Sequence, residues 1–294
     1  MILRITKSIC PVCLTVLDAN IIDEEEMIWI VRECPEHGLF KSIYWSDSAM
    51  YRRFDAYNTI GQGVYNSRKP LDAKGCPQDC GICGSHASGT LLANIDVTNR
   101  CNLNCDFCFA NARACGFVYE PTFQQIEEMF RLLRSQKPVP PPAVQLSGGE
   151  PTMRDDLVDL VKRAKELGFK LVQVATNGIK LAQDSTLAKK LKDAGVSTIY
   201  LHFDGISKET NTLFEMNKRA IESCRQEGVG MVLVPTIIGG KNDHEAGGII
   251  QFAADNIDVV RGVNFQPIAF TGAATNDDLK RERITIPDLL HGIE

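Results

Sequence analysis

The sequence predicts an α/β protein, in which a small, metal-bound, cysteine-rich N-terminal region precedes a partial barrel of six strand–helix units. Nine of the eleven cysteines fall within the first 108 of the 294 residues. After about residue 90, apolar strand-like runs alternate with amphipathic helical stretches. Glycine-containing turns end these strands roughly every 30 residues, which is typical of repeated βα units around a parallel sheet.

The first cysteine group indicates a mononuclear metal site. Cys10 and Cys13 form one knuckle, and Cys34 and His37 form a second one after twenty intervening residues. Three thiolates and one imidazole at this spacing suit tetrahedral zinc, and they also suit a rubredoxin-like iron. Either metal would order a segment that is too small to fold alone.

The second group, Cys76, Cys80 and Cys83, has spacers of three and two residues, which suits an auxiliary iron–sulfur cluster. A fourth ligand is missing from the run. His86, Cys115 or a more distant residue could supply it, and an open iron, a structural zinc site or inert thiols are the alternatives.

The barrel follows from the alternation of strands and helices. The helix near residue 126 has a capping box at Thr122 and Gln125. Strands are expected at 91–97, 143–147, 171–176, 198–203, 231–238 and 263–267. The intervening helices are expected around 126–133, 157–168, 184–194, 209–227 and 245–256. Six strands are fewer than the eight of a closed barrel, so an open barrel is predicted. Cys224 shares a helical face with apolar residues and is expected to be a core thiol.

The third group, Cys101, Cys105 and Cys108, follows the first barrel strand. Three thiolates at this spacing can hold three irons of a [4Fe–4S] cluster and leave the fourth open for chemistry. At the end of the next strand stands the run Ser147-Gly148-Gly149-Glu150, whose glycines would let backbone groups approach a ligand closely.

Together with the aromatic Phe107, these two motifs resemble the radical SAM superfamily. The resemblance implies that the open iron binds the amino and carboxylate groups of S-adenosylmethionine (SAM), whose sulfur–carbon bond is cleaved by one electron to a 5′-deoxyadenosyl radical. It implies a cofactor-binding role for Phe107 and for the residues of the Ser147–Glu150 run. Later strand ends would line the cofactor or substrate cleft through Thr176, Asn177, His202, Asp204, Pro235 and Gln266.

The order of the cysteine motifs is similar to that in a group containing tetraether lipid synthase and hydroxymethylpterin methyltransferases. The resemblance favours hydrogen abstraction from an unactivated C–H bond and the joining of isoprenoid lipid chains carbon to carbon. The first alternative is methyl transfer to 7,8-dihydro-6-hydroxymethylpterin, and the second is an iron–sulfur electron-transfer module without catalysis. The expected partners are a small-molecule or lipid substrate and an electron donor such as ferredoxin or flavodoxin.

The composition divides the chain into three predicted segments. Residues 1–50 would form the rubredoxin-like or zinc-knuckle domain, residues 51–90 the linker with the auxiliary cluster, and residues 91–294 the barrel. A net charge of −5 with interspersed signs argues against a general nucleic-acid binder. With no signal-peptide pattern and no apolar run of about 20 residues, we expect a cytoplasmic protein without a transmembrane segment, for which a lipid substrate would still permit peripheral membrane contact. The last residues read as a helix cut after one turn, so the natural chain is expected to continue.

Overall fold

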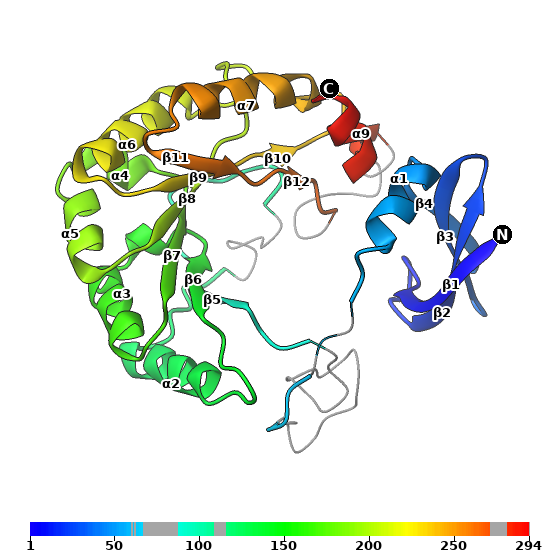
Figure 1. Cartoon of the computed structure of the whole chain (residues 1–294), viewed down its shortest axis with the longest axis horizontal. Coiled ribbons are helices and arrows are strands. Elements are labelled where there is room, and N and C mark those ends of the chain that lie inside the picture. The colour runs from blue at the N-terminus through cyan, green and yellow to red at the C-terminus, as the bar shows by residue number, and fades with distance from the viewer. Residues whose placement is uncertain (60, 62, 67–87, 109–115, 271–280, 294) are drawn as a thin grey trace. The chain divides into compact units, whose positions relative to one another are not determined.

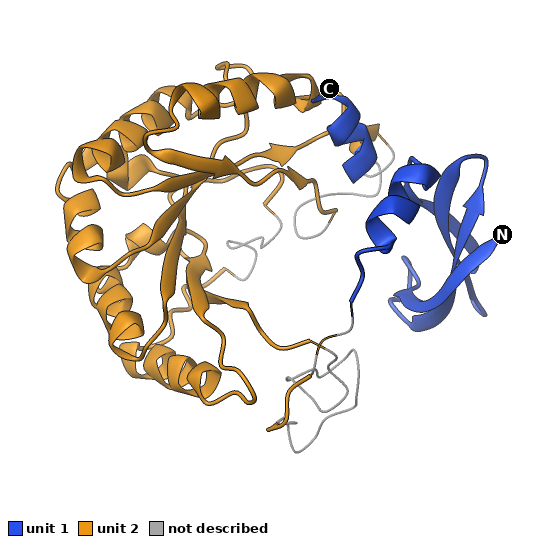
Figure 2. Ribbon diagram, viewed as in Figure 1, with its two compact units in different colours: residues 1–59, 283–294 blue, residues 60–282 orange. Residues whose placement is uncertain are grey.

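The computed structural model describes residues 1–59, 61, 63–66, 88–108, 116–270 and 281–293. The chain divides into two compact units, residues 1–59 with 283–294, and residues 60–282 (Figure 2). No helix in the described ranges is long and apolar enough to cross a membrane. The predicted domain boundaries at residues 50 and 90 stay predictions, since much of the segment between them lies outside the described residues.

The first unit is built on an antiparallel meander in the order β1-β2-β3-β4. Its strands are β1 (Ile2–Ile9), β2 (Val16–Glu24), β3 (Met27–Cys34) and β4 (Gly38–Trp45). Alternation along β2 buries Leu17, Ala19 and Ile21, as expected for a sheet with one covered face. The sheet therefore has a small core on one side only, and the hairpin ends carry the metal-site residues.

Two short helices complete this unit. Helix α1 (Ser48–Asp55) is capped by Asp47, and its Tyr51 packs in a core with Ile21 and Ile28. Helix α9 (Ile286–His291) begins after the cap residue Thr285, whose Oγ1 lies 2.8 Å from Ser46 Oγ. Sequence periodicity around Tyr51 did not predict α1, because the helix is short and mostly polar.

The second unit confirms the predicted partial barrel. Its six-stranded sheet has the order β11-β9-β8-β7-β6-β5, and every neighbouring pair is parallel (Figure 1). The strands are β5 (Leu92–Thr98), β6 (Ala143–Gly148), β7 (Leu171–Thr176), β8 (Thr198–His202), β9 (Met231–Val234) and β11 (Val260–Val263). A short parallel pair is formed by β10 (Thr236–Ile237) and β12 (Gln266–Pro267). The last strand of the sheet, β11, thus shares only Val263 with the predicted 263–267 strand. The end of that predicted strand forms β12 instead.

Helices cover the outer face of this sheet (Figure 1). They are α2 (Phe123–Arg134), α3 (Leu157–Glu166), α4 (Ile179–Gln183), α5 (Leu187–Ala194), α6 (Phe214–Glu227) and α7 (Ala246–Asp255), with short 3-10 turns η1 (Pro151–Met153) and η2 (Asp243–Glu245). The capping box of α2 at Thr122 and Gln125 is confirmed. Strand side chains that face the helices, such as Val144, Leu146 and Val174, are fully buried. The carboxyl ends of β5 to β8 consequently meet at one edge, as parallel strands require.

Candidate metal and cofactor sites

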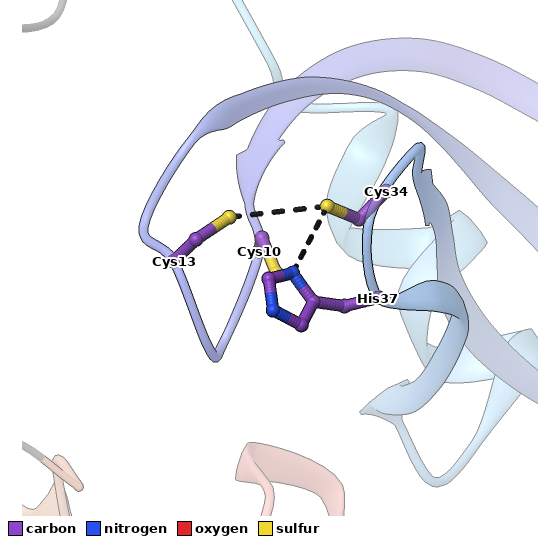
Figure 3. Close-up of side chains that lie close together, drawn as sticks. All are labelled: Cys10, Cys13, Cys34 and His37. Atoms are coloured by element: carbon purple, nitrogen blue, oxygen red, sulfur yellow. Dashed lines mark hydrogen bonds between the residues drawn. The ribbon is translucent and has the colours of Figure 1, made fainter.

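Two hairpin ends of the first unit bring four metal-ligating side chains together. Cys10 and Cys13 lie on the turn between β1 and β2, while Cys34 ends β3 and His37 lies on the turn that leads to β4 (Figure 3). Their ligand atoms all lie within 4.8 Å of one another. The backbone N–H of Val12 donates to Cys10 Sγ over 3.4 Å.

The spacing of these atoms fits a tetrahedral ion. Bonds of about 2.3 Å to sulfur and about 2.0 Å to nitrogen would place two sulfurs roughly 3.8 Å apart, and a sulfur and a nitrogen roughly 3.6 Å apart. The Sγ atoms of Cys13 and Cys34 are 3.8 Å apart. His37 Nδ1 lies 3.7 Å from Cys10 Sγ and 3.5 Å from Cys34 Sγ. The four side chains therefore match one metal ion through His37 Nδ1.

The second cysteine group that the structure describes lies on the irregular loop that follows β5. Cys101 and Cys108 are partly buried, and Cys105 is exposed. Although its side chain is exposed, the surrounding loop partly desolvates the Cys105 thiolate and raises its pKa, and the charges of Cys101 and Cys108 raise it further. Thiolates that oppose one another's ionisation suit a site where metal supplies the positive charge. Because the thiolates of an iron–sulfur cluster can bind different irons, they need not converge on a single point as the first group does.

The glycine pair at the end of β6 holds the start of this loop. The N–H of Gly149 donates to Thr98 O over 2.8 Å, and the N–H of Glu150 donates to Arg100 O over 2.7 Å. A Cβ on Gly148 would lie 2.2 Å from Thr98 O, and one on Gly149 would lie 2.3 Å from Arg100 O. Among the described residues, the close approach that glycine permits is thus made by the backbone of the cysteine loop.

Glu150 joins the ends of β6 and β7. Its side chain is almost completely buried, and its carboxylate accepts from the hydroxyl groups of Thr152 and Thr176, at 2.6 and 2.7 Å, and from the backbone of Asn177, at 2.7 Å. The Thr152 N–H adds a fourth bond at 3.1 Å. Glu150 therefore ties the carboxyl ends of β6 and β7 together through buried hydrogen bonds.

Asn177 links Glu150 to the cysteine loop. Its Nδ2 donates to Oδ1 of Asn102, the residue after Cys101, over 2.7 Å. Its carbonyl accepts from Asn217 Nδ2 on α6 over 3.2 Å. Sequence reasoning missed Asn102 and Asn217. The signal for Asn217 was a single amide on the otherwise apolar face of α6, where Cys224 is buried, as predicted.

His202 and Asp204 form a pair where β8 ends. His202 Nε2 lies 2.7 Å from Asp204 Oδ2. The N–H of Thr236 donates to Asp204 Oδ1 over 2.9 Å, which fixes the carboxylate. Burial acts to lower the pKa of His202, but the bond to Asp204 and the charges of Asp204 and Glu150 outweigh it, so the pKa is raised. The Asp204 charge also contributes to the raised pKa of Cys105, which puts the pair in electrostatic contact with the loop.

The structure also describes four of the other positions predicted to line the cofactor or substrate cleft. Phe107 lies under a cation, since Lys241 Nζ is 4.0 Å from its ring centroid. Ser147 lies on β6, directly before the glycine pair. Pro235 and Gln266 are adjacent, with the Gln266 N–H donating to Pro235 O over 2.9 Å. The auxiliary motif of Cys76, Cys80 and Cys83 lies outside the described residues, as do His86 and Cys115.

Comparisons with known proteins agree with both sites. Residues 95–253 match the radical SAM superfamily, and residues 2–46 match the HMPTM N-terminal zinc ribbon domain. The chain is 52% identical, over 98% of its length, to 7,8-dihydro-6-hydroxymethylpterin dimethyltransferase from Methanocaldococcus jannaschii, and it spans 58% of that relative's length. It is 38% identical to Fe-coproporphyrin III synthase from Methanosarcina barkeri over 48% of this chain and 36% of that protein.

Among solved structures, a radical S-adenosylmethionine methyltransferase from Kitasatospora setae aligns with 81% of this chain and 46% of its own, at 14% identity and a TM-score of 0.44.

The relative from M. jannaschii overturns one expectation. The joining of isoprenoid lipid chains was predicted first, but the relative that matches nearly the whole chain is named for a pterin dimethyltransferase. The assignment to the joining of lipid chains and to lipid biosynthesis is corrected accordingly, whereas the grouping with tetraether lipid synthase stays a prediction.

Proposed function

The chain belongs to the radical SAM superfamily, and from this premise we propose that it transfers methyl groups to a reduced hydroxymethylpterin. Membership in the superfamily implies a [4Fe–4S] cluster and SAM, which when bound supply a 5′-deoxyadenosyl radical. The observation that carries the substrate proposal is the 52% identity to a pterin dimethyltransferase across 98% of the chain. Because the chain spans 58% of that relative, the activity is proposed for the whole protein to which these residues belong.

In this proposal each part of the barrel edge has a separate task. Cys101, Cys105 and Cys108 hold the cluster, while the glycine pair and Asn177 fix the loop that presents it. Ser147 and the backbone beside Glu150 lie at the same edge and would contact SAM. Thr176, buried with its hydroxyl on Glu150, would position that edge.

His202 carries positive charge at this edge while it is protonated, and Asp204 balances that charge across a 2.7 Å contact. With its pKa raised by Asp204 and Glu150, the imidazolium form persists to higher pH than in an ordinary histidine. A cation beside the cluster loop is a suitable partner for the carboxylate of SAM. Lys241 adds a second cation over the ring of Phe107, the residue before Cys108, and is itself paired with Glu282 over 3.1 Å.

Three further assignments are also proposals. Cys76, Cys80 and Cys83 would hold an auxiliary [4Fe–4S] cluster. The Cys10, Cys13, Cys34 and His37 site would hold zinc, in agreement with the zinc ribbon match, and elemental analysis of anaerobically purified protein separates zinc from iron. A low-potential donor such as ferredoxin or flavodoxin would supply the electron, in a reducing cytoplasm that keeps the thiols free.

The test is anaerobic turnover of the reconstituted protein with a reductant, SAM and 7,8-dihydro-6-hydroxymethylpterin. We expect 5′-deoxyadenosine together with a pterin that has gained methyl groups by mass spectrometry, and neither product with Cys105→Ala. Formation of 5′-deoxyadenosine without any methylated pterin would contradict the substrate and leave the superfamily chemistry intact.

A further inference from the structure

The two faces of the barrel sheet differ in chemistry. On the face covered by the helices, Val144, Val172 and Ile199 are fully buried and apolar. Strand side chains alternate between faces, so the neighbours of these residues point to the inner, concave side (Figure 1). The inner positions of β5 to β8 are largely polar, which is unusual for a surface that only has to pack.

The polar residues of the inner face fall into a layer. In the register of the sheet, Asn94 pairs with Gln145, Gln145 with Gln173, and Gln173 with Thr198. Four neighbouring strands thus place an asparagine, two glutamines and a threonine side by side at the same height in the sheet. One step nearer the carboxyl edge, Asp96 pairs with Ser147. Both Asn94 and Asp96 are exposed, so the layer is open to a ligand at β5.

Two atoms of this layer lack partners. Gln145 Oε1 and Gln173 Oε1 are buried, and no donor in the described part of the chain reaches either of them. Gln173 is only 9% exposed. A buried amide oxygen without a donor is costly, and a bound water, ion or ligand is the kind of group that removes this cost. A ligand with N–H or O–H donors at this place would satisfy both oxygens.

We infer that this layer, with Asp96, binds the 2-amino-4-oxopyrimidine edge of the pterin; the inference rests on the proposed function and names the residues that select the substrate. The edge offers an amino group and an adjacent ring N–H, which match the carboxylate of Asp96 and the oxygens of Gln145 and Gln173. Its carbonyl accepts from a glutamine Nε2. A hydrocarbon chain at this place would leave the glutamine oxygens without donors.

The position of the layer suits this role. Gln173 stands three residues before Thr176, the last residue of β7, which corresponds to about 10 Å along a strand. The cysteine loop lies at that edge, held by Asn177 to Asn102. A ring anchored on the layer can therefore extend its substituted end toward the cluster and SAM while its pyrimidine edge stays fixed.

The experiment measures equilibrium binding of 6-hydroxymethylpterin to the anaerobic, metal-loaded chain through pterin fluorescence. Replacing Gln173→Leu removes the amide at nearly constant volume and should weaken binding about 5- to 150-fold. The matched control is Gln136→Leu, since Gln136 Oε1 is also buried without a partner but lies beyond the end of α2, outside the barrel sheet. This control should bind as the wild type does.

A second comparison isolates Asp96, whose exposure makes Asp96→Asn harmless to folding. The wild type should prefer 6-hydroxymethylpterin to 6-hydroxymethyllumazine, which carries an oxygen in place of the 2-amino group, by about tenfold or more. Asp96→Asn should abolish that preference, an effect that a purely structural role would not produce. Tight pterin binding that neither variant changes overturns the inference and leaves the proposed function standing. A wild type that neither binds nor methylates the pterin overturns both.

Discussion

The zinc ribbon and the barrel edge each carry three cysteines, yet they fix them in opposite ways. In the ribbon, two hairpin turns bring four ligand atoms within 4.8 Å, and the ligands themselves complete the site. At the barrel edge, three thiols stand on one irregular loop, held by the backbone of Gly149 and the side chain of Asn177. A site that the protein completes is suited to holding structure, whereas a site left incomplete is suited to chemistry.

The largest expected difference is in stability. Replacing Cys34→Ser, or removing the metal with a chelator, should unfold residues 2–46 locally, because structural zinc contributes on the order of 10 kcal/mol to such domains. Hydrogen exchange of that segment should rise to unprotected rates, while the iron–sulfur absorbance of the barrel stays unchanged. The control is Cys224→Ser, a buried thiol with no metal role, which should leave the ribbon protected.

The reverse change is expected at the barrel edge. Cys105→Ala should reduce SAM cleavage to background and lower the iron content, because the cluster loses one of three protein ligands. Exchange protection of the ribbon should not change, since its four ligands are untouched. Loss of ribbon protection in this variant would show that the two sites depend on each other and would contradict the comparison.

The glycine pair should matter for packing at the barrel edge. Gly149→Ala would bring a Cβ to 2.3 Å from Arg100 O, a backbone atom that cannot yield without moving the cysteine loop. We expect a loss of about 1–3 kcal/mol in unfolding free energy and a lower iron content on reconstitution. Gly247→Ala is the control: a Cβ there meets nothing within 4 Å, so this helical site should gain up to about 1 kcal/mol. Equal denaturation midpoints for the two variants would argue against the close packing of the glycine pair on the cysteine loop.

The smallest expected effect concerns pH. Burial acts to lower the pKa of His202 and Asp204 raises it, with a net upward shift from the ordinary 6.5. The pair therefore stabilises the fold fully below the unfolded pKa, and this contribution is lost as pH rises through the folded pKa.

Asp204→Asn keeps the Oδ1 acceptor for Thr236 and removes the charge. The gap in denaturant midpoint between wild type and variant should narrow with rising pH. A gap that widens with pH would show that the imidazole is buried neutral instead.

Much of the molecule could be predicted from local patterns. Cysteine spacing predicted the four ribbon side chains that the structure brings together, because each pair lies on one tight turn. The same kind of spacing predicted the cluster loop after β5, whose ligand role stays a prediction. The capping box at Thr122 and Gln125 and the buried Cys224 were likewise visible, since each depends on neighbours within the same helix. The substrate was not visible in the sequence motifs, which recur in superfamily members with different names. The match to the M. jannaschii relative overturned the expectation of a lipid substrate.

The sequence by itself determined which residues can ligate metal and the alternation that builds a parallel sheet. Only the tertiary structure decided what those residues touch. Glu150 lies in a cofactor motif, but its carboxylate is consumed by Thr152, Thr176 and the backbone of Asn177. Gln145 and Gln173 stand 28 positions apart in sequence and are adjacent in the sheet. Contacts of this kind depend on the register between strands, which is set by the packing of whole strands and helices and leaves no local signature in the chain.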